Sequence, residues 1–191
     1  MDEKFDPLVA EWFSFVKNPN YNLAEKVLKF AQIIEYPDLE VDKYVQKINR
    51  IGMSLKESIN DVKNPTYLIS MLNEHLFQNL GFSGDDKDYF NPKNNFLNEV
   101  LEKKSGLPIT ISILYVEVAK FIGLDLKIVG FPSHILVKYN EEIDNQRKAI
   151  VSSKNYYLEV IIKQVITGNA QIWLDHKPDI IIIIPGQNAR F

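Results

Sequence analysis

The 191-residue sequence contains no cysteine. This absence excludes a thiol nucleophile, a disulfide framework, a zinc finger and an iron–sulfur cluster. Histidine is also scarce, since His75, His134 and His176 are its three occurrences and lie far apart in the chain. There is no HExxH helix, no phosphate-cradling glycine loop and no GxSxG nucleophile turn. We therefore expect neither a bound metal ion nor a cofactor.

The chain also lacks an excess of positive charge and a long apolar run. It has 22 lysine and arginine residues against 25 aspartate and glutamate residues, so neither nucleic acid nor a membrane surface is expected as a partner. The start, MDEKFDPLVAEWF, is acidic where a signal peptide is basic, which predicts a cytoplasmic protein. The most apolar run, Ile180 to Pro185, is far shorter than the roughly 20 residues of a membrane-spanning helix. Its isoleucines predict an interior or covered β-strand.

Residues 1–80 are predicted to form a helical part. Apolar residues recur there at spacings of three and four, as on one face of a helix. Helix-start signals precede these patterns: Asp6-Pro7, Asn22 with Glu25, Pro37-Asp38, Ser54 with Glu57, and Asn64-Pro65. Gly52 is expected to end the third helix and Gly81 the last one.

Residues 81–191 are predicted to form an α+β core that makes one compact unit with the helical part. The polar stretch Gly81 to Asn95 holds Phe82, Tyr89 and Phe90, and because disordered segments are poor in aromatic residues, an ordered loop is predicted. Its aspartates lack the glycine and the terminal glutamate of a calcium-binding EF-hand loop.

Two helices and then a sheet are expected after this loop. A short helix over 96–102 precedes the turn Ser105 to Pro108, which begins a longer helix that runs through Ile122 and ends at Gly123. The segments LKIVG, HILVKY, YYLEVII and the isoleucine run are short, β-branched and bounded by turn residues, which predicts strands. Helices followed by strands favour an α+β protein with a mostly antiparallel sheet packed on a central helix.

Residues 88–139 resemble the SirB family of transglutaminase-like proteins. The resemblance rests on short motifs: Asn94-Asn95-Phe96-Leu97, Val100-Leu101, Gly106-Leu107-Pro108-Ile109, Leu114-Tyr115, Glu117-Val118-Ala119 and Gly130-Phe131-Pro132-Ser133-His134. Members occur in bacteria with a helical N-terminal part, and relatives occur among eukaryotic F-box proteins. The resemblance implies a papain-like core, in which a cysteine begins a buried helix and a histidine and an aspartate come from adjacent strands.

That core activates its cysteine through the positive end of the helix and through the histidine, which the acid orients. By the resemblance, Pro108 occupies the position of the nucleophile, His134 that of the histidine and Glu159 that of the acid. Proline carries no side-chain nucleophile, so the resemblance implies a vestigial site and a pseudoenzyme.

Three functions remain open from the sequence. The first is a non-catalytic transglutaminase-like module that binds a protein, peptide or small ligand, with a regulatory role, through Tyr89, Phe90, Asn94 and His134. The second is a hydrolase or acyl transferase that uses the hydroxyl of Thr110 or Ser112 with His134 and Glu159. The third is an interaction scaffold that works through its helical half.

Overall fold

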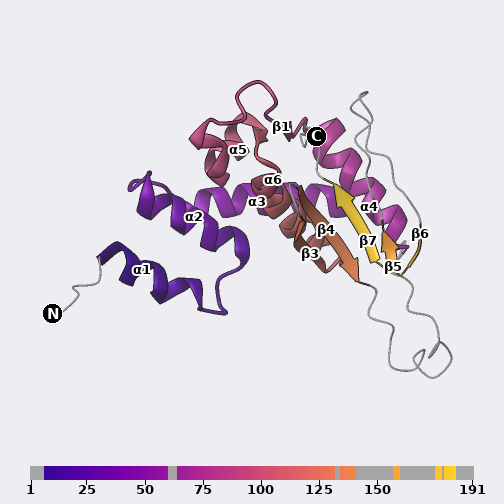
Figure 1. Cartoon of the computed structure of the whole chain (residues 1–191), viewed down its shortest axis with the longest axis horizontal. Coiled ribbons are helices and arrows are strands. Elements are labelled where there is room, and N and C mark those ends of the chain that lie inside the picture. The colour runs from indigo at the N-terminus through magenta and orange to yellow at the C-terminus, as the bar shows by residue number, and fades with distance from the viewer. Residues whose placement is uncertain are drawn as a thin grey trace.

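The computed structural model describes residues 7–59, 64–131, 134–140, 157–159, 175–177 and 179–183, and only the backbone is described for residues 131, 134 and 140 and for the last three of these ranges. The helices are α1 (Pro7–Val16), α2 (Leu23–Ile34), α3 (Val41–Glu57), α4 (Pro65–Asn73), α5 (Leu97–Lys103) and α6 (Pro108–Ala119), with the shorter η1 (Glu74–Asn79), η2 (Pro92–Asn95) and η3 (Lys120–Ile122) (Figure 1). The strands are β1 (Ser83–Gly84), β2 (Ser105–Gly106), β3 (Leu126–Phe131), β4 (His134–Asn140), β5 (Tyr157–Glu159), β6 (Asp175–Lys177) and β7 (Asp179–Ile183).

Local capping chemistry sets two of the predicted helix starts. Asn22 and Glu25 form the predicted capping box at α2, in which each side chain accepts a hydrogen bond from the other residue's backbone N–H. At α4 the side-chain oxygen of Asn64 accepts a hydrogen bond from the Tyr67 backbone N–H at 3.1 Å. Asp6, predicted to cap α1, lies outside the described residues.

The sequence prediction was wrong about the third helix. Pro37-Asp38 lies in a turn, and α3 begins later, at Val41. Gly52 does not end the helix, and Ser54 does not begin another, because α3 continues through both to Glu57. A Cβ atom at Gly52 would collide with the ring of Phe121 in η3. Gly52 therefore allows the close approach of two helical segments, which overrides its low intrinsic helix propensity.

The strands form three small sheets in the described part of the chain, and two of them are antiparallel, in line with the prediction of a mostly antiparallel sheet. β3, β4 and β7 make one sheet in that order, and β5 pairs with β6 in another. The short β1 and β2, which the sequence pattern did not predict, pair in parallel on either side of the loop and α5. Each helix and strand pattern is local, but the pairing of β1 with β2 joins residues that are far apart in the chain.

The predicted isoleucine strand is present as β7. It pairs with β4, lies at the edge of the described three-stranded sheet and contacts β5. That it is an interior or covered strand stays a prediction. Its register places Ile182 opposite Val137, whose side chain is fully buried. The isoleucine side chains themselves lie outside the described residues.

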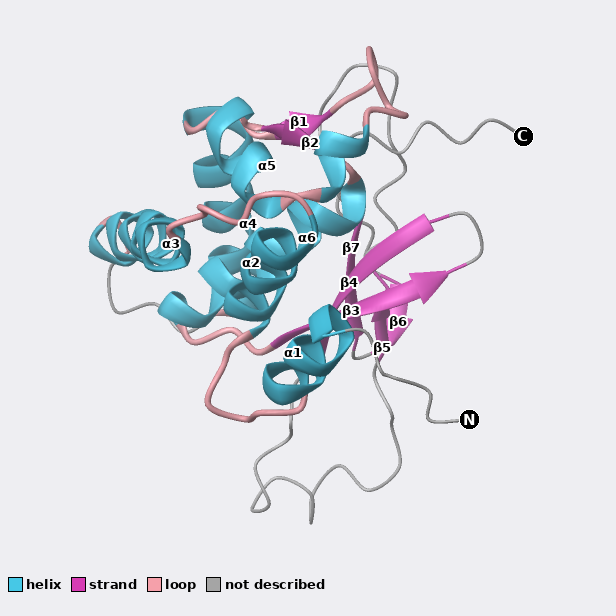
Figure 2. Ribbon diagram, turned by 90° about the vertical axis from the view of Figure 1, so that its left-hand side faces the viewer, coloured by secondary structure: helices cyan, strands magenta, loops and turns pink. Residues whose placement is uncertain are grey.

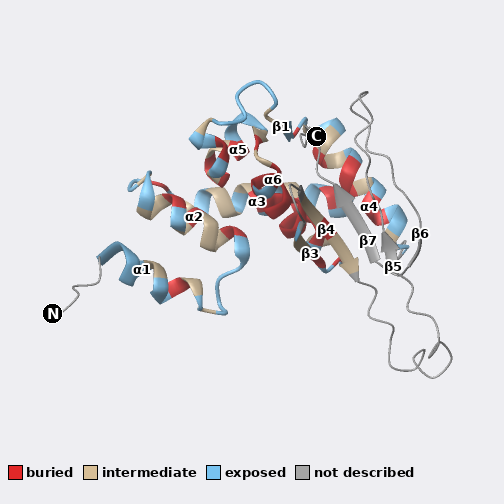
Figure 3. Cartoon of the chain, viewed as in Figure 1, coloured by how far each residue is buried: buried red, intermediate tan, exposed pale blue. Residues whose placement is uncertain are grey.

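α6 is the centre of the core. Of its residues, only Ile109 is not buried, which is typical of a helix enclosed on all sides. It contacts α2, α3, α4 and α5 as well as β3 and β4. Figure 2 shows α2, α3 and α5 on one side of α6 and the sheet of β3, β4 and β7 on the other, and Figure 3 shows many buried residues on α6.

One hydrophobic cluster joins the predicted helical part to the predicted α+β core. It includes Leu28 of α2, Leu55 of α3, Leu72 of α4 and Val118 of α6. The outermost helix, α1, packs against α2 through an edge-to-face contact between Trp12 and Phe30, with ring centroids 5.2 Å apart. No helix in the described part of the chain is long and apolar enough to cross a membrane.

Candidate functional site

The start of α6 is where the sequence places the vestigial nucleophile. Leu107 is the N-cap in an extended conformation, and Pro108 is the first helical residue, as predicted. Proline suits this position because its backbone lacks the N–H that a first-turn residue leaves unpaired, and its φ is already helical. The Pro108 side chain is buried. The backbone therefore begins a helix where the resemblance places the nucleophile, but the side chain at this position has no reactive atom.

The two hydroxyl groups that follow Pro108 are engaged inside the protein. Thr110 Oγ1 donates to the Asn94 carbonyl oxygen at 2.9 Å, and the Thr110 residue is 1% exposed. Ser112 Oγ donates to the Pro108 carbonyl oxygen at 2.7 Å and is fully buried. Each hydroxyl thus satisfies a backbone acceptor, and neither is presented to solvent.

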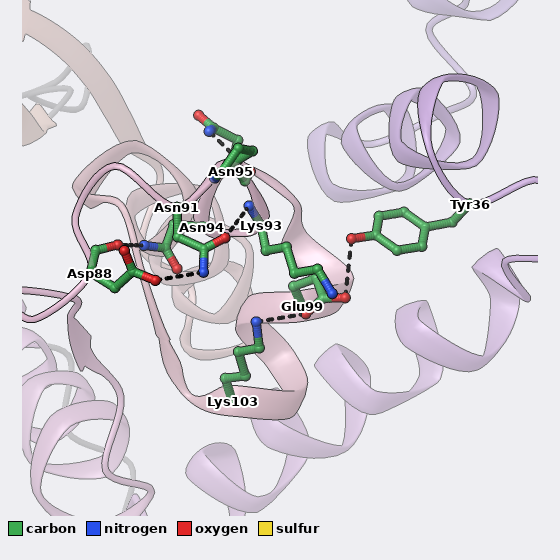
Figure 4. A network of polar contacts seen from close by, with 9 residues as sticks. Tyr36, Asp88, Asn91, Lys93, Asn94, Asn95, Glu99 and Lys103 are labelled. Carbon is green, nitrogen blue, oxygen red and sulfur yellow. Dashed lines mark hydrogen bonds and ion pairs between the residues drawn. The ribbon is translucent and has the colours of Figure 1, made fainter.

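The loop that leads to α5 is held by side-chain hydrogen bonds (Figure 4). Asp88 organises it: its carboxylate accepts from Asn91 Nδ2 at 2.8 Å, and its carbonyl accepts from Asn94 Nδ2 at 2.8 Å. The Asp85 carboxylate accepts from the Asp88 backbone N–H at 2.9 Å. This bond, aided by the Asn94 side chain, lowers the pKa of Asp85. The Asn94 carbonyl, which accepts from Thr110, ties the loop to α6.

The predicted binding residues of this loop differ sharply in exposure. Phe90 is 92% exposed and Tyr89 is 46% exposed, with their rings edge to face and the centroids 5.4 Å apart. Asn94 is 1% exposed and its side chain is used inside the loop. The two aromatic rings are therefore available to a partner, whereas Asn94 supports the loop that carries them.

The structure places the backbones of the predicted histidine and acid, while their side chains lie outside the described residues. His134 is the first residue of β4, opposite Phe131, as its predicted strand position required. Glu159 is in β5, opposite Asp175 of β6. Among the described strands, β5 does not pair with β4. The roles of His134 and Glu159 at a common site stay predictions.

A polar cluster that the sequence analysis missed joins the α2–α3 connection to α5. Tyr36 Oη donates to Glu99 Oε1 at 3.0 Å, and Lys103 Nζ lies 2.9 Å from Glu99 Oε2 (Figure 4). Burial and then the bond to Glu99 raise the pKa of Tyr36 to about 12. Burial opposes ionisation of Glu99, but the bonds from Lys103 and Tyr36 outweigh it and lower the pKa of that carboxyl. No sequence motif signals a contact between residues this far apart.

A cavity of about 190 Å³ lies apart from this site. Its lining includes Val45 and Ile48 of α3 and Phe121 of η3. The buried Glu117 also faces it and accepts a hydrogen bond from Lys120 Nζ at 2.7 Å. In the described part of the chain, no three histidine, aspartate or glutamate residues are grouped so that they could hold a metal ion.

Comparison with known families assigns the chain to a superfamily. Residues 42–168 match the family model of the transglutaminase-like superfamily. The chain belongs to this superfamily. It is a transglutaminase-like chain that has no cysteine at any position.

Several curated proteins are similar to this transglutaminase-like chain. A UPF0162 protein of Xylella fastidiosa is 35% identical over 104 residues, which are 54% of this chain and 37% of the relative. F-box only protein 21 of Mus musculus is 35% identical over 141 residues, 73% of this chain and 21% of the relative. The chain thus spans well under half the length of these relatives. No solved structure shows significant similarity to it.

Proposed function

We propose that the chain is a non-catalytic member of the superfamily, of the SirB type, and that it binds a protein, peptide or small ligand. The observation that supports this proposal is Pro108 at the first position of α6, where the resemblance places the nucleophile. Its side chain cannot attack a carbonyl, and the chain has no cysteine that could replace it. A fold of this kind hosts binding sites as readily as catalytic ones.

The alternative of a hydroxyl-dependent hydrolase or acyl transferase has weaker support. Thr110 or Ser112 would have to break an internal hydrogen bond and leave a buried position to reach a substrate. A hydroxyl also needs a well-oriented base within about 3 Å to become a nucleophile. The geometry at the start of α6 therefore favours binding over hydrolysis.

Labelling with a fluorophosphonate probe separates these functions. We expect no covalent adduct on the purified full chain, measured by intact-protein mass spectrometry. The matched variants are Thr110→Val and Ser112→Ala, each of which removes one candidate hydroxyl. An adduct that disappears in one of these variants and also in His134→Ala would establish the hydrolase and refute the non-catalytic proposal.

The position of the lost nucleophile has its own test, Pro108→Cys. A thiol at a helix start beside an imidazole is expected to have a pKa below the ordinary value of about 8.5. The measurement is the rate of alkylation by iodoacetamide against pH, in the presence and absence of His134→Ala. Met53→Cys, at a side chain that is 57% exposed on α3, is the control. If the alkylation rates of Pro108→Cys, of Pro108→Cys with His134→Ala, and of Met53→Cys depend on pH in the same way, position 108 is not the nucleophile position.

The scaffold function is a second candidate, and one observation favours it. Much of the exposed large apolar surface of the described residues lies on α1, α2 and the turn between them: Leu8, Val9, Phe13, Tyr21, Leu23, Phe30 and Ile34. Exposed apolar side chains gathered on two neighbouring helices are typical of interaction sites. Ile34→Ser, at a side chain that is 53% exposed at the end of α2, should lower the fluorescence of bound 1-anilinonaphthalene-8-sulfonate without changing the melting temperature, and unchanged dye binding would count against this candidate.

A further inference from the structure

Phe90 is an unusual residue for a soluble protein surface. Its exposed fraction, 92%, is the largest among the exposed large apolar side chains of the described residues. Tyr89 lies against it edge to face. Single exposed apolar residues are common, but here two neighbouring aromatic residues of one loop are both exposed and their rings lie against each other.

The loop that carries the rings is ordered rather than loose. Side-chain bonds hold it at Asp85, Asp88 and Asn91, and Asn94 ties it to α6 through its carbonyl oxygen. Aromatic side chains on a pre-organised loop lose little conformational entropy when they bind. The loop backbone that carries the rings is therefore held in place before any partner binds.

The surroundings of the rings select the class of partner. The rings project outward, whereas small-molecule sites are concave. Asp85, Asp86 and Asp88 precede them in sequence and outnumber Lys87 and Lys93, the two lysines of the same loop. This negative charge repels nucleic-acid phosphates and anionic lipid. A symmetric contact between two copies would bring the same aspartates together. A cationic segment of another protein fits both the exposed rings and the negative charge of this loop.

We propose that Tyr89 and Phe90 form a docking site for a basic segment of a partner protein, whose arginine or lysine side chains stack on the rings beside Asp86. The inference rests on the proposed binding function and gives it a surface and a partner class. A guanidinium or ammonium group over an aromatic face is attracted by the ring quadrupole. Nearby carboxylates add charge complementarity, which increases the rate of encounter and fixes orientation.

A random peptide library displayed on phage, panned on the immobilised full chain and counter-selected on Phe90→Ser, tests the proposal. We expect the enriched peptides to combine arginine or lysine with apolar residues. For a synthesised peptide from this pool, fluorescence anisotropy should show binding about ten-fold weaker to Phe90→Ser. Asp86→Lys should also weaken binding, and so should added salt. Met53→Ser, at an exposed apolar residue of α3, is the matched control and should bind as the wild type does.

Each other result overturns the proposal. Enriched peptides without basic residues, or no enrichment over Phe90→Ser, exclude a basic partner segment. A wild-type dimer that Phe90→Ser dissociates in analytical ultracentrifugation assigns the rings to a second copy instead. Since Phe90 is almost fully exposed, Phe90→Ser should leave the melting temperature unchanged. Fluorophosphonate labelling refutes the non-catalytic function and leaves the peptide result standing, so the two failures are distinguishable.

Discussion

Replacing Gly52 with alanine should destabilise the protein, although alanine is the better helix former. In the middle of a helix, Gly→Ala gains about 1 kcal/mol from propensity alone. At Gly52 the added Cβ would overlap the ring of Phe121, with the ring atom Cε2 only 2.7 Å away. Inserting a methyl group into such a contact costs about 1–3 kcal/mol, because the ring or the helix must shift.

The net effect follows from these opposing contributions. Phe121 also borders the cavity beside α3, so its ring has space into which it can move. This places the steric cost near the middle of its range, and we expect Gly52→Ala to lower the free energy of unfolding by about 1 kcal/mol. For a chain of this length such a change lowers the melting temperature by roughly 2–4 °C.

The sign of the effect should reverse when the obstructing ring is removed. In a Phe121→Ala background, Gly52→Ala should stabilise by about 0.5–1 kcal/mol, because only the propensity gain remains. The measurement is urea unfolding followed by far-UV circular dichroism, compared at equal m-value. Gly81→Ala is the control. Gly81 has a φ of +76°, which strains any residue that carries a Cβ atom, and no other atom lies within 4 Å of a Cβ built there. Gly81→Ala should therefore destabilise the protein equally in both backgrounds. Stabilisation by Gly52→Ala in the wild type would refute this reasoning.

Three further substitutions test buried polar contacts. Tyr115→Phe should cost about 1–3 kcal/mol, since the hydroxyl donates to Asn73 Oδ1 at 2.8 Å in the core, and Asn73→Leu in the same chain should recover much of that loss in urea unfolding. Glu99→Gln should flatten the acid limb of stability. Folding lowers the pKa of the Glu99 carboxyl from 4.5, so the wild type loses this contribution to stability as the pH falls through the folded-state pKa. If the free energy of unfolding depends on pH equally in the wild type and in Glu99→Gln, the contacts of Glu99 are wrong. Thr110→Val and Ser112→Ala should each cost about 1 kcal/mol in calorimetry, because each loses one buried hydrogen bond while its acceptor keeps a backbone donor, which for the Asn94 carbonyl is the Leu107 N–H at 3.2 Å.

Local chemistry made much of the fold predictable. The capping box of Asn22 and Glu25, the Asn64-Pro65 start and the Pro108 start are each decided within a few residues, so the sequence identified those helices. The β-branched segments identified strands in the same way. The motifs around Pro108 also carried the resemblance to transglutaminase-like proteins, and the family match confirms that superfamily. Absence was equally informative, since a chain without cysteine excludes the thiol chemistry of this core.

Tertiary packing decided what the sequence pattern could not. Glycine is typical of helix ends, but Gly52 lies inside α3, where the absence of a side chain leaves room for Phe121. Because Phe121 is far from Gly52 in the chain, the local pattern could not predict this contact. The hydroxyl of Thr110 was a candidate nucleophile by position, and the carbonyl of Asn94 makes it a buried donor. Tyr36 meets Glu99 across a long stretch of chain. Propensities and caps act between neighbours in sequence, whereas burial and hydrogen-bond partners depend on which segments the fold brings together.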